Sequence, residues 1–212
     1  MVCHARHVYF HALEPGAPIS AHACRSTMYR GSFDIEPDGE ERHPQRIETP
    51  EMESYSSMIP WDLPQRGALP PLRMYWYDGG MQPHRPVELD SHVHLPKSGL
   101  LFVGDHGKLF AGYSGGNERP LPEKESRDFK APPKTLARTT GHYQEWIDAC
   151  KTAKPTTCDF EFGSRMAKIA QLGAMAVGAA QPLEWDATAE RVTNDAEANS
   201  WVNPPYRKDR SR

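Results

Sequence analysis

The 212-residue sequence is long enough to bury a substantial hydrophobic core, as one large domain or as two small ones. It is 38% hydrophobic and 25% charged, which is typical of a soluble globular protein and argues against a disordered one. The formal net charge of −3 provides no basic field, so non-specific binding to nucleic acid is excluded as a main function.

The sequence also bears on location and redox state. No stretch approaches about eighteen consecutive apolar residues, and the first residues lack the apolar core and cleavage site of a signal peptide. We therefore expect a cytoplasmic protein without membrane contact. Cys3, Cys24, Cys150 and Cys158 form no C-x-x-C pair, which favours reduced, structural cysteines over a zinc site or a disulfide scaffold.

The first predicted element is a helix over residues 5–14, which the Pro-Gly pair at 15–16 breaks and caps. The next segment, APISAHACRST, alternates apolar and polar side chains as a half-buried strand does. Ile19, Ala21 and Ala23 would lie on its apolar face.

A polar, acidic run over residues 31–53 has no periodicity and is expected to be a loop. The segments SYSSMIPWDLP and PPLRMYWYDGG predict strands, the second stopped by an Asp-Gly-Gly turn. In GLLFVGDHGKLFAGY, two apolar runs flank Gly104 and Gly107, which predicts a hairpin whose glycines supply a positive φ. Residues 114–138, rich in proline and charge, are expected to form a long surface loop.

Two amphipathic helices follow, in TGHYQEWIDACKTA and in SRMAKIAQLGAMAVGAA, and the second is expected to be well buried. The apolar stripe of the first consists of Tyr143, Trp146, Ile147 and Cys150. Thr139 or Thr140 is its expected N-cap. LEWDA then predicts an edge strand, and a brief helix near DAEANSWV precedes a basic tail.

The order of these elements predicts the fold class. Strands come first and helices second, without β-α-β alternation. This order predicts an α+β fold, in which an open, mostly antiparallel β-sheet has helices packed on one face and leaves the other face free. We expect that free face to accommodate a ligand, a partner or a second domain.

Two short segments suggest metal or phosphate chemistry. GDHGK (104–108) superficially resembles a phosphate-binding loop, but a strand and not a helix is expected to follow it, so we interpret it as a hairpin turn. DSHVH holds His92 and His94, which on a strand would point the same way and could share a metal; the alternative is a solvated loop.

The common catalytic fingerprints do not support an enzyme class for this sequence. The G-x-S-x-G pattern does occur, as GYSGG over 112–116, but it leads into the expected surface loop. There is no strand-turn-helix to form a nucleophile elbow, which argues against a serine hydrolase. There is also no G-x-G-x-x-G, so any redox function would need a nucleotide site from elsewhere.

The segment YWYDGG has two interpretations. Its aromatic residues belong either to the core or to a sheet surface, as most strand aromatics do. Alternatively, Tyr75, Tyr77 and Asp78 form a mixed face that binds sugar hydroxyls, by stacking on the rings and by hydrogen bonds to the carboxylate.

Four stretches, in this order, carry a family resemblance: LRMYWYDGGMQPHRPVEL, GLLFVGDHGKLFAGY, TGHYQEWIDACK and LEWDATAERVTNDAEAN. Together they resemble the C-terminal half of bacterial oxidoreductases of the glucose-fructose oxidoreductase / inositol dehydrogenase / MocA (Gfo/Idh/MocA) family. The resemblance runs from about Cys3 to Tyr206. Each stretch is moderately specific, and four in order make a closer match.

The resemblance implies a division of labour. In such enzymes an N-terminal Rossmann domain binds NAD or NADP, and the C-terminal α+β domain supplies substrate contacts and the oligomer interface. Substrates are sugars, cyclitols and their derivatives. The implied division of this chain is a remnant of the interdomain catalytic segment over 1–16, the substrate and oligomerisation domain over 17–206 and a basic tail over 207–212.

The resemblance also implies site residues. His4 falls on a family histidine near the nicotinamide, which would make it the catalytic, proton-handling residue. Its family partner, an aspartate four residues earlier, would precede Met1, and His7 stands where the family often has an aspartate. The implied chain has no cofactor or metal site of its own and is inactive without a Rossmann partner.

Four further residues are predicted to line a sugar or polyol pocket: Tyr75, Asp78, Arg85 and His142. Each also has a structural interpretation. His142 would then only help to cap its helix, and Arg85 would only pair with a nearby acid.

Two alternatives stay open. The first is a noncatalytic module that forms homo-oligomers through the open sheet face. The second is a metal-dependent hydrolase that uses the N-terminal histidines, His4, His7 and His11, which share a helix face, together with His92 and His94.

Overall fold

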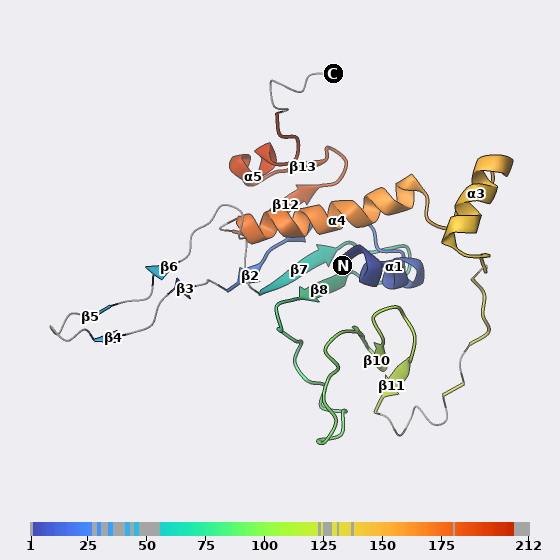
Figure 1. Ribbon diagram of the computed structural model, residues 1–212, viewed down its shortest axis with the longest axis horizontal. Coiled ribbons are helices and arrows are strands. Elements are labelled where there is room, and N and C mark those ends of the chain that lie inside the picture. Colours follow the sequence, from blue (N-terminus) through green and yellow to red (C-terminus); the bar gives the residue numbers. More distant parts are fainter. Residues whose placement is uncertain are drawn as a thin grey trace. The chain divides into compact units, whose positions relative to one another are not determined.

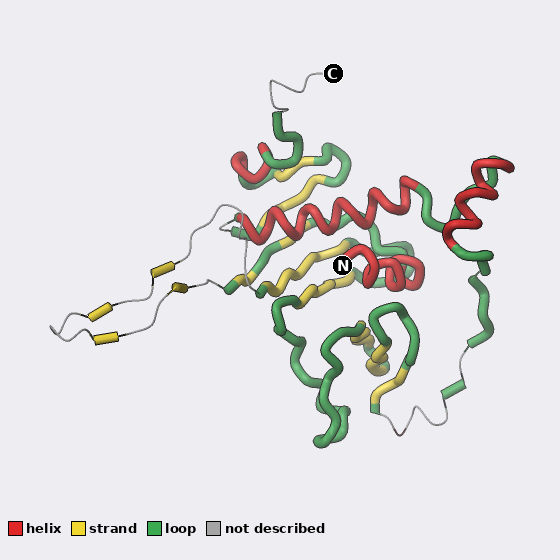
Figure 2. Tube along the Cα trace, viewed as in Figure 1, coloured by secondary structure: helices red, strands yellow, loops and turns green. Residues whose placement is uncertain are grey.

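The computed structural model describes residues 2–26, 29–30, 34–35, 41–42, 45–46, 56–122, 124, 129–130, 132–136, 138–179 and 181–205, with the backbone alone for 2–4, 6 and the paired residues between 29 and 46. The chain divides into two compact units. Unit 1 comprises Met1–Ala12 and Arg85–Lys168, and unit 2 comprises Leu13–His84 and Ile169–Arg212. Helices and antiparallel strands occur together, which confirms the predicted α+β class (Figure 2).

Unit 2 contains a six-stranded sheet in which every pair is antiparallel (Figure 1). Its strands are β1 (Ser20–Ala21), β2 (Cys24–Arg25), β7 (Ser57–Leu63), β8 (Leu72–Tyr77), β12 (Leu183–Asp186) and β13 (Arg191–Val192). The order is β13-β12-β1-β7-β2, and β8 pairs with the other side of β7. The central strand β7 therefore connects both halves of the sheet.

Helix α4 (Phe160–Gly178) begins in unit 1 and continues into unit 2, where it packs on one face of the sheet. The expected burial of this helix is confirmed, because its buried hydrophobic side chains recur at helical spacing: Met166, Ile169, Leu172, Ala176 and Val177. A Cβ at Gly173 would lie 2.2 Å from Cζ2 of Trp61, which is 1% exposed. Because Gly173 has no side chain, the indole of Trp61 can occupy the space next to the α4 backbone.

The sheet face under α4 follows the alternation of β7. Ile59, Trp61 and Leu63 are buried on this face, and so is Leu183 of β12, opposite Ala21. The prediction that Ile19 shares this buried face is wrong, because its side chain is 52% exposed.

Further short elements complete unit 2. Two two-stranded ladders pair β3 (Tyr29–Arg30) with β6 (Gln45–Arg46), and β4 (Asp34–Ile35) with β5 (Glu41–Arg42). They fall within or beside the run over 31–53, so an unbroken loop there was the wrong prediction. Helix α5 (Ala196–Ser200) is present as expected and is capped by the Asp195 carboxylate, which accepts from the amide of Ala198.

The described elements of unit 1 are α1 (Val2–Leu13, whose last residue belongs to unit 2), β9 (Leu100–Gly104), β10 (Gly107–Ala111), β11 (Arg119–Leu121), α3 (His142–Thr152) and the start of α4. The strands form an antiparallel sheet in the order β11-β10-β9. The predicted hairpin is confirmed, whereas β11 lies inside the segment that was expected to be a loop throughout.

Several local predictions about turns and caps are wrong. Gly104 and Gly107 flank the hairpin turn without a positive φ, so the turn does not use their conformational freedom. The N-cap of α3 is Gly141, at φ 112°, and not a threonine. Only glycine adopts that φ readily, and the chain enters the helix without a side-chain cap. After α1, the residue with positive φ is Glu14 (φ 43°) and not Gly16.

Two further expectations concern the sheet edge and the cysteines. β12 is an interior strand, because it pairs with both β1 and β13, so its prediction as an edge strand is wrong. Cys24, Cys150 and Cys158 are free thiols, as expected, but they are exposed and do not form part of a core. The side chain of Cys3 lies outside the described residues. Within the described part of the chain, no helix is both long and apolar enough to cross a membrane.

Candidate functional site

The face of the unit 2 sheet opposite α4 carries a hydrogen-bonded group of polar and aromatic side chains. On β7, Asp62 alternates with the buried Trp61, and the strand register places Arg73 of β8 directly opposite Asp62. On the other side of Asp62, the register places Ser20 of β1. Three strands therefore bring three polar residues into one row across the sheet.

Hydrogen bonds fix this row. The Nε of Arg73 donates to Oδ1 of Asp62 at 2.6 Å, and the Ser20 hydroxyl donates to Oδ2 at 2.9 Å. The bond from Arg73 is the main cause that lowers the pKa of the Asp62 carboxyl below its usual value; Ser20 and His22 act in the same direction and partial burial opposes them. Asp62 is therefore ionised at neutral pH and holds the guanidinium in one orientation.

Two tyrosines continue the row along β8. Tyr75 and Tyr77 point to the same face as Arg73, and their rings stack at 6.1 Å with an interplanar angle of 18°. Tyr75 is 46% exposed. Burial, and to a lesser degree Tyr75, raise the pKa of Tyr77, so its phenol is a neutral hydrogen-bonding group at physiological pH. We call Ser20, Asp62, Arg73, Tyr75 and Tyr77 the open-face row.

The open-face row is chemically suited to binding hydroxyl groups. The Arg73 side chain is 58% exposed. Asp62 engages its Nε and a side-chain hydrogen bond also links the guanidinium to Tyr75, but a guanidinium has five N–H donors, so further donors remain. The carboxylate of Asp62 accepts, the phenols do both, and the tyrosine rings offer an apolar surface. None of the hydrogen bonds within the row joins a hydroxyl to a histidine, so the row has the character of a binding surface and not of an activated nucleophile.

Of the four predicted pocket residues, Tyr75 lies in this row and Asp78 does not. The Asp78 carboxylate accepts from the amide of Ser57 at 2.6 Å, from the Ser57 hydroxyl at 2.9 and 3.0 Å, and from Nε1 of Trp76 at 3.1 Å. Ser57 and Trp76 point to the α4 side of the sheet, so Tyr75 and Asp78 serve opposite faces. The prediction that Asp78 shares a face with Tyr75 and Tyr77 is therefore wrong. The carboxylate on the face of the two tyrosines is that of Asp62.

Arg85 organises a loop of unit 1. Its guanidinium donates to the carbonyl of Leu89 at 2.7 Å and also to the carbonyl of Asp90. The expected structural partner was an acidic side chain, but backbone carbonyls serve instead. These hydrogen bonds give Arg85 a structural role in the loop. Its predicted contact with a substrate stays a prediction.

His142 and His4 give less information. His142 is the first residue of α3, exposed, with its ring 4.1 Å from that of Tyr143. The backbone of His4 lies in α1, but its side chain lies outside the described residues, so the predicted catalytic role stays a prediction. Tyr75 and Asp78 belong to unit 2 and Arg85 and His142 to unit 1, and each unit is described by itself.

The other two histidines of α1 pack against α4 within unit 1. The His11 ring stacks on Phe162 at 4.5 Å and 22°, and the His7 ring lies 4.6 Å from that of His11 and 5.5 Å from that of Phe162. The guanidinium of Arg165 lies over Phe162. His7 and His11 are thus packing residues of this unit.

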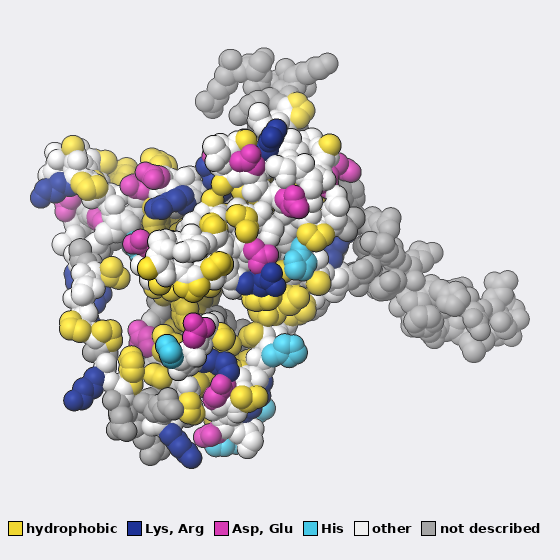
Figure 3. Space-filling model, turned by 180° about the vertical axis from the view of Figure 1, so that it is seen from behind, with side chains coloured by type: hydrophobic (Ala, Val, Ile, Leu, Met, Phe, Trp, Pro, Cys, Tyr) yellow, Lys and Arg dark blue, Asp and Glu magenta, His cyan; other side chains and the backbone are white. Residues whose placement is uncertain are grey.

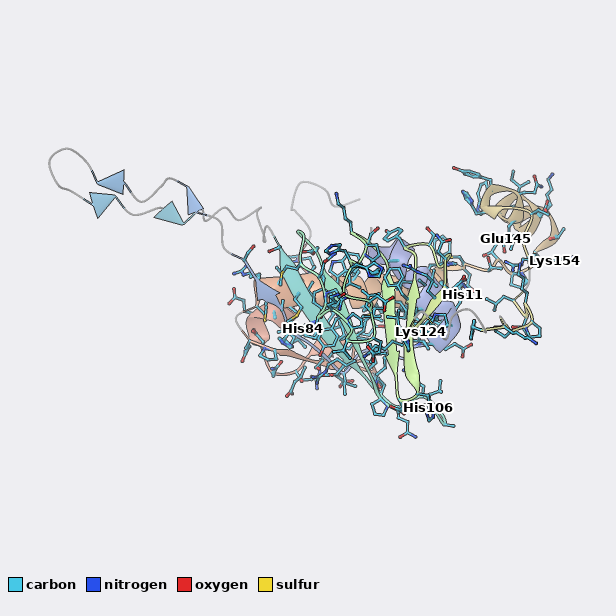
Figure 4. All side chains as sticks on the ribbon, turned by 90° about the horizontal axis from the view of Figure 1, so that it is seen from below. His11, His84, His106, Lys124, Glu145 and Lys154 are labelled. Atoms are coloured by element: carbon cyan, nitrogen blue, oxygen red, sulfur yellow. The ribbon has the colours of Figure 1, made fainter. Side chains whose placement is uncertain are left out.

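This packing predicts a pH effect. Burial, followed by the proximity of His11, lowers the pKa of His7 below 6.5 in the folded protein, so folding favours its neutral form. The stability that depends on neutral His7 is present above about pH 6.5 and is lost as the pH falls from there through the lowered pKa. Thermal melts at a series of pH values should show a steeper acid loss for the parent than for His7→Asn. His106→Asn, at the exposed tip of the β9-β10 hairpin (Figure 4), should keep the parental slope; equal slopes for parent and His7→Asn would contradict the prediction.

The motifs that suggested phosphate and metal chemistry take up other positions. The turn between β9 and β10 confirms GDHGK as a hairpin, and Nζ of Lys108 pairs with both carboxylate oxygens of Glu88, at 2.5 and 2.7 Å. His92 and His94 lie exposed in a loop and not on a strand. In the part of the chain that the structure describes, no three histidine, cysteine or acidic residues are grouped as metal ligands would be.

Sequence reasoning missed Ser20, Asp62 and Arg73 as site residues. A signal was present, because pairing SMIPWDL with LRMYWY as an antiparallel hairpin places Asp62 and Arg73 opposite one another. The register itself depends on the connection at 64–71, which contains a bridge between Arg66 and Leu69.

Comparison of the chain with protein-family models, with curated proteins and with solved structures gave no match. The family resemblance therefore rests on the sequence motifs alone.

Proposed function

We propose that this chain binds a sugar or cyclitol, as the substrate-binding part of an NAD(P)-dependent oxidoreductase of the Gfo/Idh/MocA type. The observation that carries the proposal is the open-face row: a guanidinium held by Asp62 at 2.6 Å lies on the same strand and the same face as two stacked tyrosines. Polyols present hydroxyls at their edges and C–H groups on their faces. The row offers charged donors and acceptors for the first and aromatic rings for the second.

The residues of this chain do not provide the binding site for the nicotinamide nucleotide that such a reaction needs. The sequence contains no G-x-G-x-x-G, so this chain's own residues do not fit the pyrophosphate of NAD or NADP. Accordingly, no step of hydride transfer is assigned to it. Its proposed task is to hold and orient the polyol, with His4 proposed as the residue that handles the hydroxyl proton in an assembly with a Rossmann domain.

The proposal predicts measurable polyol binding by the chain alone. Saturation-transfer NMR with myo-inositol, glucose and xylose should give signals from at least one of them, and titration should give its affinity. Arg73→Gln and Tyr75→Ala should each weaken that affinity about tenfold or more, because one removes charge-assisted donors and the other a stacking surface. Both side chains are substantially exposed, so both variants should stay folded.

The matched control is Tyr143→Ala, which removes an equally large and more exposed tyrosine from α3. It should leave polyol affinity unchanged. Absence of signal from every polyol, or equal affinities for the parent and the two open-face variants, would contradict the proposal.

A second candidate use of the same face is assembly with a copy of this chain. Met58 of β7, which is half-buried, lies on it opposite Tyr77, whereas Pro60 opposite Tyr75 is already buried. Met58 and the two tyrosine rings would bury apolar area if two sheets met face to face. If light scattering showed a dimer that Tyr75→Ala dissociates, this use would be favoured over polyol binding.

A further inference from the structure

Helix α3 exposes the apolar stripe that its sequence carries. None of its residues is buried; Tyr143 is 76% exposed, Trp146 65% and Ile147 37%, and Cys150 is also exposed. Figure 3 shows hydrophobic side chains among charged ones in the region of this helix, at the upper left. Isolated helices of about this length are marginal in water, so packing of the stripe against another surface would stabilise α3.

The opposite side of α3 is the side tied to its own chain. The carboxylate of Glu145 accepts from the amide of Thr157 at 2.6 Å and from its hydroxyl at 3.0 Å. Glu145 lies about 100° around the helix from Trp146 and about 160° from Ile147, the two edges of the stripe, given about 100° per residue. The chain thus anchors the helix by its polar side and leaves the apolar side outward.

We propose that the α3 stripe is an interface with a second copy of this chain, formed by two antiparallel α3 helices. The stripe is symmetric about the point between Trp146 and Ile147, with Tyr143 and Cys150 at equal distances on either side. A two-fold axis through that point places Trp146 against the partner's Ile147, and Tyr143 against the partner's Cys150. The two-fold axis therefore places every residue of the stripe opposite an uncharged residue of the partner's stripe.

The charges of α3 agree with this arrangement. The stripe contains no ionised side chain, and Glu145 and Asp148 lie on the other side of the helix. Lys151 borders the stripe beside Ile147, near the C-terminal end of the helix, so the two-fold axis would place the two copies of this lysine at opposite ends of the pair. No like charges would be brought together or desolvated in the pair. The absence of charge on the stripe, with charge behind it, is the pattern of an interhelical seam.

The area available sets the strength of the association. Two aromatic side chains that are mostly exposed offer roughly 150–250 Å² each when fully buried, and Ile147 and Cys150 add less. The pair would bury on the order of 800–1,000 Å² in total, which is at the low end for a specific interface. The expected species is a weak, concentration-dependent dimer, independent of whether the open-face row binds a polyol.

Sedimentation equilibrium of the full chain tests this. The apparent mass should rise from monomer toward dimer with concentration, and Trp146→Ser should shift the midpoint at least tenfold upward in concentration. Phe160→Ser is the matched control, because Phe160 is 100% exposed but is not part of the stripe, and it should leave the midpoint unchanged. Strict monomer at all concentrations, or a dimer unaffected by Trp146→Ser, would overturn the proposal.

Cross-linking tests the antiparallel register even if Trp146→Ser folds poorly. In a chain with Cys3, Cys24 and Cys158 replaced by serine, Tyr143→Cys should form a disulfide with the partner's Cys150 under mild oxidation, since facing Cα atoms must come within about 7 Å. The same chain with Tyr143 retained should not cross-link. A Cys150-to-Cys150 disulfide, or no cross-link in either chain, would refute the antiparallel pair. A dimer that Tyr75→Ala dissociates instead would place the interface on the open face.

Discussion

Replacing Trp61 by alanine is expected to lower the free energy of unfolding by about 3–5 kcal/mol. The indole is 1% exposed, lies in the central strand β7 and fills the space against Gly173 of α4. Its removal would leave a cavity between the helix and the sheet that the surrounding side chains can only partly close. Urea unfolding followed by circular dichroism at far-ultraviolet wavelengths measures the loss.

Trp201→Ala is the control for this substitution. Trp201 is 40% exposed and follows α5, so its loss should cost much less than that of Trp61. If both substitutions cost the same, the packing of Trp61 against α4 would not be the main support of the unit 2 core. Gly173→Leu should also be strongly destabilising, because even a Cβ at this position overlaps the indole.

Replacing Asp78 by alanine is expected to cost about 2–3 kcal/mol of stability, because it leaves buried polar groups without partners. Ser57 is 2% exposed, and both its amide and its hydroxyl donate to the Asp78 carboxylate. Nε1 of Trp76 loses the same acceptor. Thermal and urea unfolding should show the loss directly.

Asp105→Ala, in the exposed β9-β10 turn, is the control and should change stability by less than about 0.5 kcal/mol. Polyol titration of both variants separates the two interpretations of Asp78. If Asp78→Ala abolished polyol binding while stability stayed at the parental value, its carboxylate would be a ligand contact, and the structural account would be wrong.

The parts of the fold that depend on local pattern could be predicted from the sequence. The strand in PPLRMYWYDGG, the hairpin around GDHGK and the buried helix α4 all occur where aromatic propensity, turn residues and a 3.6-residue apolar period indicated them. Position within the sheet could not be predicted in this way. β12 looks like an edge strand locally, and only its pairing with both β1 and β13 makes it interior.

The candidate site shows the same division. Tyr75 was predicted, because an aromatic residue in a strand is visible in one segment. Asp62 and Arg73 become a pair only through the register of β7 and β8, which is a relation between segments. Asp78 was assigned to the wrong face for the related reason that its partners, Ser57 and Trp76, depend on which side of the sheet α4 covers.

For α3, the apolar period predicted the helix correctly but said nothing about what would cover it. The same i, i+3, i+4, i+7 spacing of apolar residues occurs in helices that pack in a core and in helices that expose an interface. Only the exposure of Tyr143 and Trp146 separates the two.

Strand β7 couples ligand binding on one face of the sheet to the folding of the core on the other. Trp61 and Asp62 are adjacent in the strand, one in the core and the other in the open-face row, so a molecule that grips the row binds only the folded sheet. By thermodynamic linkage such a molecule must raise the melting temperature of unit 2 in proportion to the logarithm of its concentration above its dissociation constant. Intrinsic tryptophan fluorescence would follow the unfolding, so a library of polyols can be screened by melting temperature without any assay of catalysis.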